Sequence, residues 1–67
     1  MENMSLENIV KIITHEYAFS DVETVKEVSL NGINFLEIEY CYLGNVKKVC
    51  VRADSVIKVV YRQIEEV

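Results

Sequence analysis

The first apolar residues of the chain recur at the spacing of a helix. Most members of this set lie three or four positions from another member, as residues do on the side of a helix that packs on a core. The set is Leu6, Ile9, Val10, Ile13 and Tyr17. Ser5 precedes it and has a side chain suited to capping a helix N-terminus. The pattern therefore predicts a helix over residues 6–16.

The middle of the chain combines β-prone stretches with two turn-forming dipeptides. Asn31-Gly32 separates two runs rich in branched and aromatic residues, and Gly44-Asn45 separates two more. A two-residue hairpin loop of type I′ needs positive φ at both positions, which asparagine and glycine tolerate best. The first loop places Val28 opposite Phe35, so the sequence predicts an antiparallel hairpin there and a second hairpin after it.

The second loop places Tyr40 opposite Val49. The registers set by the two loops agree, because both put the same residues on the same face of the sheet. One face then carries a continuous apolar set, as a half-buried sheet requires. The predicted helix is expected to cover this set, which is Val25, Leu36, Ile38, Tyr40, Tyr42, Val49, Val51 and Ala53.

The C-terminal apolar run has two interpretations. Residues 56–61 are dense in β-branched side chains, which favours a fourth strand that follows a three-residue loop and extends the same sheet. The rival is a C-terminal helix capped by Asp54 or Ser55, because apolar residues from 57 to 67 also fit helical spacing. We therefore predict an α+β fold with one N-terminal helix packed on a four-stranded antiparallel β-meander, and αβββα as the alternative.

Length and composition fit one small globular domain over residues 1–67. Of the 67 residues 51% are hydrophobic, and a chain of this size has little core to spare for a deep pocket. Charged residues such as Lys11, Glu37 and Lys58 interrupt the apolar runs before they reach the roughly 18 residues of a membrane helix. The acidic start lacks the features of a secretory signal, and two cysteines are too few for a disulfide framework. We therefore expect a cytoplasmic protein with free thiols.

Residues that could perform catalysis or bind metal are few. His15 is the only histidine, and its separation from Cys41 and Cys50 matches none of the short spacings of zinc sites. Gly32 and Gly44, the only glycines, are both used by the predicted turns, which excludes a glycine-rich phosphate loop. We expect no metal, no cofactor and no enzymatic activity.

A pair of carboxylates on one strand is better explained as part of a charge ladder. Glu37 and Glu39 share a strand face, a spacing that two-carboxylate catalysis could use. In the predicted register, however, Glu37 lies between Lys26 and Arg52. The sequence therefore favours cross-strand ion pairs on a solvated face.

The sheet face opposite the predicted helix carries apolar side chains where polar ones are expected. These residues flank the first turn, with one more from the C-terminal run, and are Val28, Leu30, Ile33, Phe35 and Val56. Such a surface suits another protein or a second copy of the chain, unless the C-terminal residues fold back over it. Small acidic chains without catalytic equipment include phage- and mobile-element-type inhibitors of host proteins. We expect a noncatalytic protein-interaction module of this kind.

The alternative function uses the uneven distribution of charge. Residues 1–39 hold eight acidic and two basic side chains, whereas residues 40–67 hold five basic and three acidic ones. Four of the bases lie on the same side of the predicted sheet and could bind an anion or a single-stranded nucleic acid: Lys48, Arg52, Lys58 and Arg62. The formal net charge of −4 disfavours general binding to nucleic acid.

Overall fold

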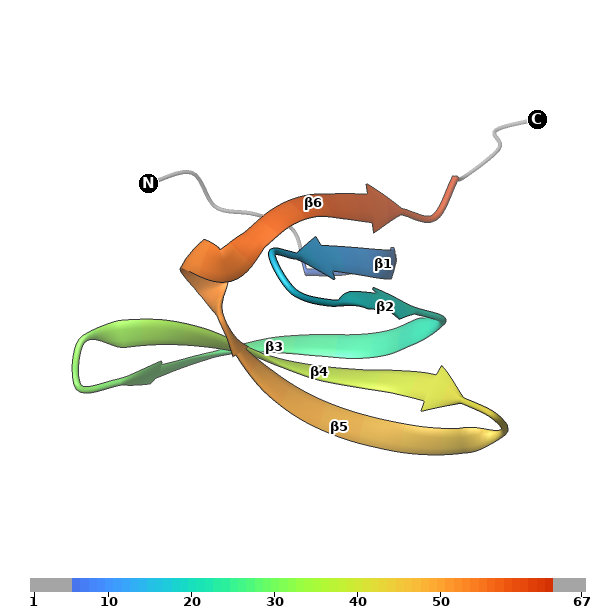
Figure 1. Ribbon diagram of the computed structural model, residues 1–67, viewed down its shortest axis with the longest axis horizontal. Helices are drawn as coiled ribbons and strands as arrows, with labels where there is room; N and C mark the ends of the chain where they lie inside the picture. The colour runs from blue at the N-terminus through green and yellow to red at the C-terminus, as the bar shows by residue number, and fades with distance from the viewer. Residues whose placement is uncertain (1–5, 64–67) are drawn as a thin grey trace.

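Strands account for most of the structure. The computed structural model describes residues 6–63, and the expected helix cap, Ser5, lies outside them. In chain order the elements are β1 (Ile9–Thr14), β2 (Ala18–Ser20), β3 (Val22–Leu30), β4 (Ile33–Tyr42), β5 (Asn45–Arg52), the 3-10 turn η1 (Ala53–Ser55) and β6 (Val56–Tyr61) (Figure 1). Residues 6–63 contain no α-helix, so both the predicted α+β fold and its αβββα alternative are wrong.

The segment predicted as a helix forms strand β1. Ile9–Thr14 is a run of β-branched residues interrupted only by Lys11, and such side chains lose rotamer freedom in a helix but pack well on a sheet. Val10 is an extra residue in the pairing of β1 with β6, so Ile9 and Ile12 both face the core although they lie three positions apart. This bulge reproduces in a strand the spacing that predicted the helix.

Two three-stranded antiparallel sheets, ordered β2-β1-β6 and β3-β4-β5, pack against each other (Figure 1). Residues 56–61 form the predicted strand, which excludes the rival helix for this segment. That strand, β6, pairs with β1 instead of extending the meander beside β5, and Val59 lies opposite Ile12. The two ends of the described chain therefore meet in one sheet.

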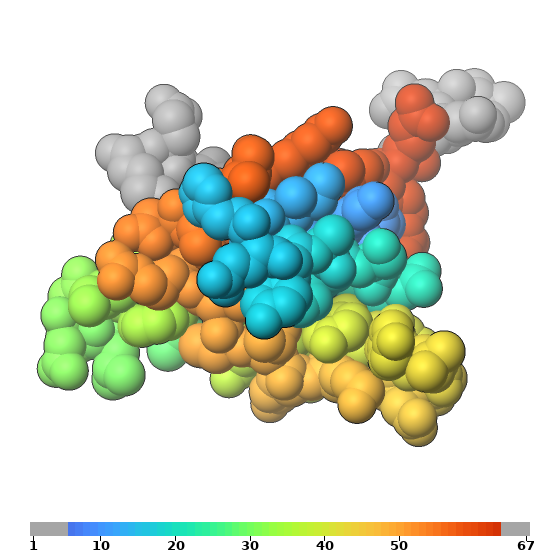
Figure 2. Space-filling model, in the orientation of Figure 1, coloured from blue at the N-terminus to red at the C-terminus, as the bar shows by residue number. Residues whose placement is uncertain are grey.

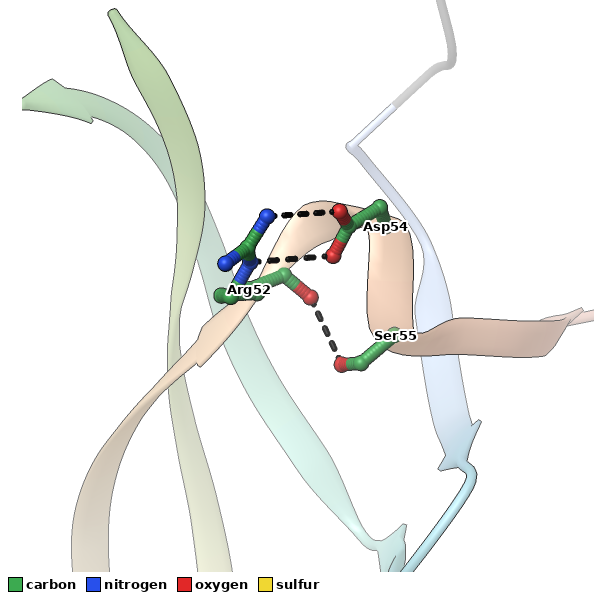
Figure 3. Close-up of polar contacts among 3 residues, drawn as sticks. All are labelled: Arg52, Asp54 and Ser55. Atoms are coloured by element: carbon green, nitrogen blue, oxygen red, sulfur yellow. Dashed lines mark hydrogen bonds and ion pairs between the residues drawn. The ribbon is translucent and has the colours of Figure 1, made fainter.

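The turn η1 directs the chain from one sheet to the other. The guanidinium of Arg52 donates two hydrogen bonds to the carboxylate of Asp54, at 3.2 and 2.9 Å, and the Ser55 hydroxyl donates to the backbone carbonyl of Arg52 at 2.7 Å (Figure 3). The backbone N–H of His15 donates to the carbonyl of Ser55 at 3.2 Å. This contact fixes η1 to the end of β1, the strand with which β6 then pairs.

At Asp21 the chain bends sharply, so that the consecutive strands β2 and β3 belong to different sheets. Asp21 has a positive φ of 54° and separates β2, which pairs with β1, from β3, which pairs with β4. The backbone N–H of Cys41 donates to the carbonyl of Asp21 at 3.0 Å. Strands that change sheets through such bends are a common way to close a small sandwich.

The two predicted hairpins are present, and one register differs from the prediction. Val28 lies opposite Phe35, as predicted from the first turn. In the second hairpin Ile38, not Tyr40, lies opposite Val49, because the turn residues are Leu43 and Gly44, with φ of 51° and 80°. The shift is two positions, so every side chain keeps the face on which it was predicted.

The core lies between the two sheets. Its buried hydrophobic residues come from both sheets and are Ile9, Ile12, Phe19, Val22, Leu36 and Ile38. Most of the predicted apolar face packs against or within this cluster, whereas Tyr42 is exposed. Sheet β2-β1-β6 thus covers the face that the predicted helix was expected to cover.

Candidate functional site

The end of the β3–β4 hairpin carries an exposed apolar surface, which we name the apolar tip. It consists of two cross-strand pairs on the face away from the core: Val28 with Phe35, and Leu30 with Ile33. Leu30 is 62% exposed and Ile33 is 39% exposed, whereas Phe35 is half-buried. The hairpin end projects from the body of the molecule, shown in green in Figure 1. All four residues were predicted as part of a contact surface, and the structure brings them together.

The opposite side of the projecting hairpin is polar. Glu27, Ser29 and Asn34 lie on that side and are all exposed. β5 ends at Arg52, opposite Phe35. The residues of the hairpin nearest the β3–β4 turn therefore extend beyond the end of β5. The hairpin end is therefore apolar on one side only.

Val56, the fifth predicted contact residue, lies elsewhere. It begins β6, pairs with Thr14 in the other sheet and packs against the core cluster. The apolar tip is therefore defined without it.

Charged side chains occupy the same outer face beyond the apolar tip. Lys26 lies opposite Glu37, as predicted, and Lys48 lies opposite Glu39. The Thr24 hydroxyl donates to the Glu39 carboxylate at 2.7 Å. The predicted pairing of Arg52 with Glu37 is wrong, because the second register differs by two positions. Opposite charges thus face each other across the strands, but the ion pair formed within residues 6–63 joins Arg52 to Asp54, not a lysine to Glu37 or Glu39.

The four predicted anion-binding bases do not form one cluster. Lys48 and Arg52 lie on the outer face of β3-β4-β5, and the Arg52 guanidinium is 2.9 Å from the Asp54 carboxylate. Lys58 lies on β6 in the other sheet, and Arg62 follows that strand, its backbone N–H donating to the Asn8 carbonyl at 2.6 Å. This arrangement gives no single site for an anion.

The candidate metal ligands are only partly brought together: His15 and Cys50 line one groove, described below, and Cys41 does not. Cys41 and Cys50 are free thiols on the outer face of β3-β4-β5, with Cys41 opposite Val46 and Cys50 opposite Glu37. Among residues 6–63, no group of three or more histidine, cysteine or acidic side chains could hold a metal ion.

A groove between the β1–β2 turn and β5 was not predicted from the sequence. Its volume is about 670 Å³, and it lies where the turn, light blue in Figure 2, stands above β5, in orange. Phe19 lines it with its ring centroid 6.2 Å from that of Tyr17 and 5.1 Å from that of Tyr40. His15 and Glu16 also line it. The groove could not be predicted from a helix over 6–16, because that helix leaves no β1–β2 turn to lie opposite β5.

Thr14 holds the turn that forms one wall of the groove. Its buried hydroxyl donates to the Tyr17 carbonyl at 3.1 Å and accepts from the backbone N–H groups of Glu16 and Tyr17, at 3.3 and 3.0 Å. The wall is therefore set by one side chain that satisfies several backbone groups.

Within residues 6–63 no helix has the length and apolar character needed to cross a membrane. The chain matches no model of a known protein family, no curated protein and no solved structure.

Proposed function

We propose that the chain is a noncatalytic protein-interaction module that binds another protein through the apolar tip. The observation that carries the proposal is the one-sided hairpin end, where Val28, Leu30, Ile33 and Phe35 share a face and the Leu30–Ile33 pair extends past the end of β5. Exposed apolar residues scattered singly are common, but a contiguous patch on a projecting element is typical of a contact surface.

The proposed contact gains its affinity from desolvation of large apolar side chains. Anchors of the size of Leu30 and Phe35 can each contribute roughly 1–3 kcal/mol when a partner buries them. The module then acts by occupying a surface of its partner, as phage- or mobile-element-type inhibitors do. A cytoplasmic location is part of the same proposal and is supported by the free thiols of Cys41 and Cys50.

The test combines identification of a partner with a matched pair of variants. The wild-type chain is used to retain proteins from cells that carry the gene, and the affinity of each purified candidate is measured. Leu30→Ser with Phe35→Ser is expected to remain folded and to weaken binding about 100-fold or more. Charge reversal at Lys58 and Arg62, in the other sheet, is the control and is expected to change affinity less than threefold or so.

Three outcomes contradict the proposal. Loss of the folded circular dichroism spectrum in the tip variant would show that Leu30 and Phe35 stabilise the fold. Concentration-dependent dimerisation that the tip variant abolishes would identify a second copy as the occupant. Greater damage from the charge reversal, with affinity falling steeply as salt rises, would favour the anion-binding alternative.

A further inference from the structure

One edge of β5 is free of any other strand within residues 6–63. Among the described strands, β5 is the last of its sheet and pairs only with β4. The Cys41 N–H on β4 donates to Asp21, on the side away from β5, so Cys41 and Val46 form a non-hydrogen-bonded pair. Hydrogen-bonded and non-hydrogen-bonded pairs alternate along an antiparallel ladder. The backbone groups of Val46, Lys48 and Cys50 therefore point away from β4, toward the free edge.

The end of this free edge is set by η1. Arg52 has the same parity as Cys50, and its carbonyl accepts the Ser55 hydroxyl at 2.7 Å (Figure 3). The Arg52 carbonyl therefore also points away from β4, as the backbone groups of alternate residues in β5 do. Because this carbonyl is already bonded to Ser55, an added strand could pair with β5 only before Arg52.

The groove described above runs beside this edge. β5 contributes Val49 and Val51, the β1–β2 turn contributes Tyr17, and Phe19 and Tyr40 lie between them. A volume of about 670 Å³ is in the range of sites that hold small ligands. The edge thus offers backbone hydrogen bonds next to a groove that combines these apolar side chains with polar ones such as His15, Glu16 and Arg52.

The two faces of β5 differ in chemistry. Val49 and Val51 face the core side and line the groove, whereas Lys48 lies on the outer side. Arg52, at the end of the strand, also lines the groove, and β5 contains no acidic residue. β4, which occupies the other edge of β5, has the complementary sequence Leu-Glu-Ile-Glu-Tyr over residues 36–40. In β4 the apolar side chains face inward and the glutamates face outward.

We propose that the free edge of β5 binds an extended peptide segment of a partner protein by strand addition, and that this segment alternates apolar and acidic residues. The apolar side chains enter the groove, and the acidic ones lie on the outer side near Lys48 and away from Glu16, which lines the groove. Strand addition takes affinity from backbone hydrogen bonds and specificity from alternate side chains. A second copy is disfavoured as occupant, because pairing two β5 edges would bring basic side chains of both copies together. This site is independent of the apolar tip.

The probe is a synthetic peptide with the sequence of residues 36–40, capped at both ends. Its binding is measured by fluorescence anisotropy, and its location by amide chemical shifts of the labelled protein. We expect shifts in β5 and the β1–β2 turn. A peptide in which lysine replaces both glutamates, and one of the same composition with adjacent glutamates, are expected to bind about tenfold or more weakly.

Two variants and their matched controls test the geometry of the edge. Lys48→Glu is expected to weaken binding of the acidic peptide about tenfold, whereas Lys58→Glu, the same change in the other sheet, leaves it within about twofold. Cys50→Pro removes an outward N–H and keeps the ladder with β4, so it is expected to weaken binding about tenfold while Cys50→Ala does not.

Methylation of single backbone nitrogens in the peptide tests strand addition without altering the protein, and decides the question if Cys50→Pro does not fold. Binding is expected to fall at alternate positions only, because one side of an added strand faces solvent. The proposal is overturned by absence of binding at millimolar peptide, by equal sensitivity at all positions, by shifts confined to the apolar tip, or by self-association through β5.

Discussion

Replacing an exposed leucine by asparagine is expected to stabilise this protein. Leu43 has a φ of 51° in the β4–β5 turn, and Asn31 has a φ of 53° at the equivalent position of the β3–β4 turn. The following glycines also match, with φ of 80° for Gly44 and 78° for Gly32. Asparagine adopts this left-handed conformation more readily than leucine does, so the two turns differ in backbone strain.

The size of the effect follows from strain and burial. Holding a residue such as leucine in the left-handed region costs roughly 1–2 kcal/mol, of which asparagine recovers a part, about 1 kcal/mol. Leu43 is 83% exposed, so its truncation loses only about 0.3 kcal/mol of hydrophobic burial. The net gain for Leu43→Asn is about 0.5–1 kcal/mol, or a rise in Tm of about 2–8 °C for a domain of this size.

Thermal unfolding followed by circular dichroism measures this gain. The reciprocal variant, Asn31→Leu, is the control and is expected to lower Tm by a similar amount. An unchanged or lower Tm for Leu43→Asn would refute the reasoning, because it would mean that Leu43 makes stabilising contacts that outweigh the strain.

Two buried positions give further predictions for urea denaturation. Ile12→Ala is expected to lower the free energy of unfolding by roughly 2–5 kcal/mol, because Ile12 has no exposed surface; a loss below about 1 kcal/mol would contradict its central place in the core. Thr14→Val keeps the side-chain volume but leaves the Tyr17 N–H without its acceptor, so a loss of roughly 1–3 kcal/mol and faster amide exchange at Tyr17 are expected.

Local signals predicted the middle of the fold. Asn31-Gly32 fixed the first hairpin because its residues favour the positive φ that the loop requires. The second loop was placed one residue too late, since Leu43 occupies a conformation that residue type argues against. The faces were still right, because the error in pairing was an even number of positions.

The rest of the fold depends on irregularities and distant pairings. The bulge at Val10 gives a strand the spacing of a helix, so periodicity alone does not distinguish the two, although the β-branched run over Ile9–Thr14 favours the strand. The partner of β6 depends on η1, whose contacts involve Arg52, Asp54 and Ser55. The apolar tip was predictable because it needs one hairpin only, whereas the groove needs the β1–β2 turn to lie opposite β5.

The pairing of β1 with β6 has a consequence for how the chain folds. Val59 lies 47 residues after its partner Ile12, whereas β3, β4 and β5 pair with their neighbours in sequence. Contacts between distant residues form slowly, because a long loop must close first. During synthesis β1 can pair with β2 as soon as both have emerged, but its other edge has no partner until β6 follows. In that interval the unpaired edge of β1 is open to aggregation and to capture by chaperones.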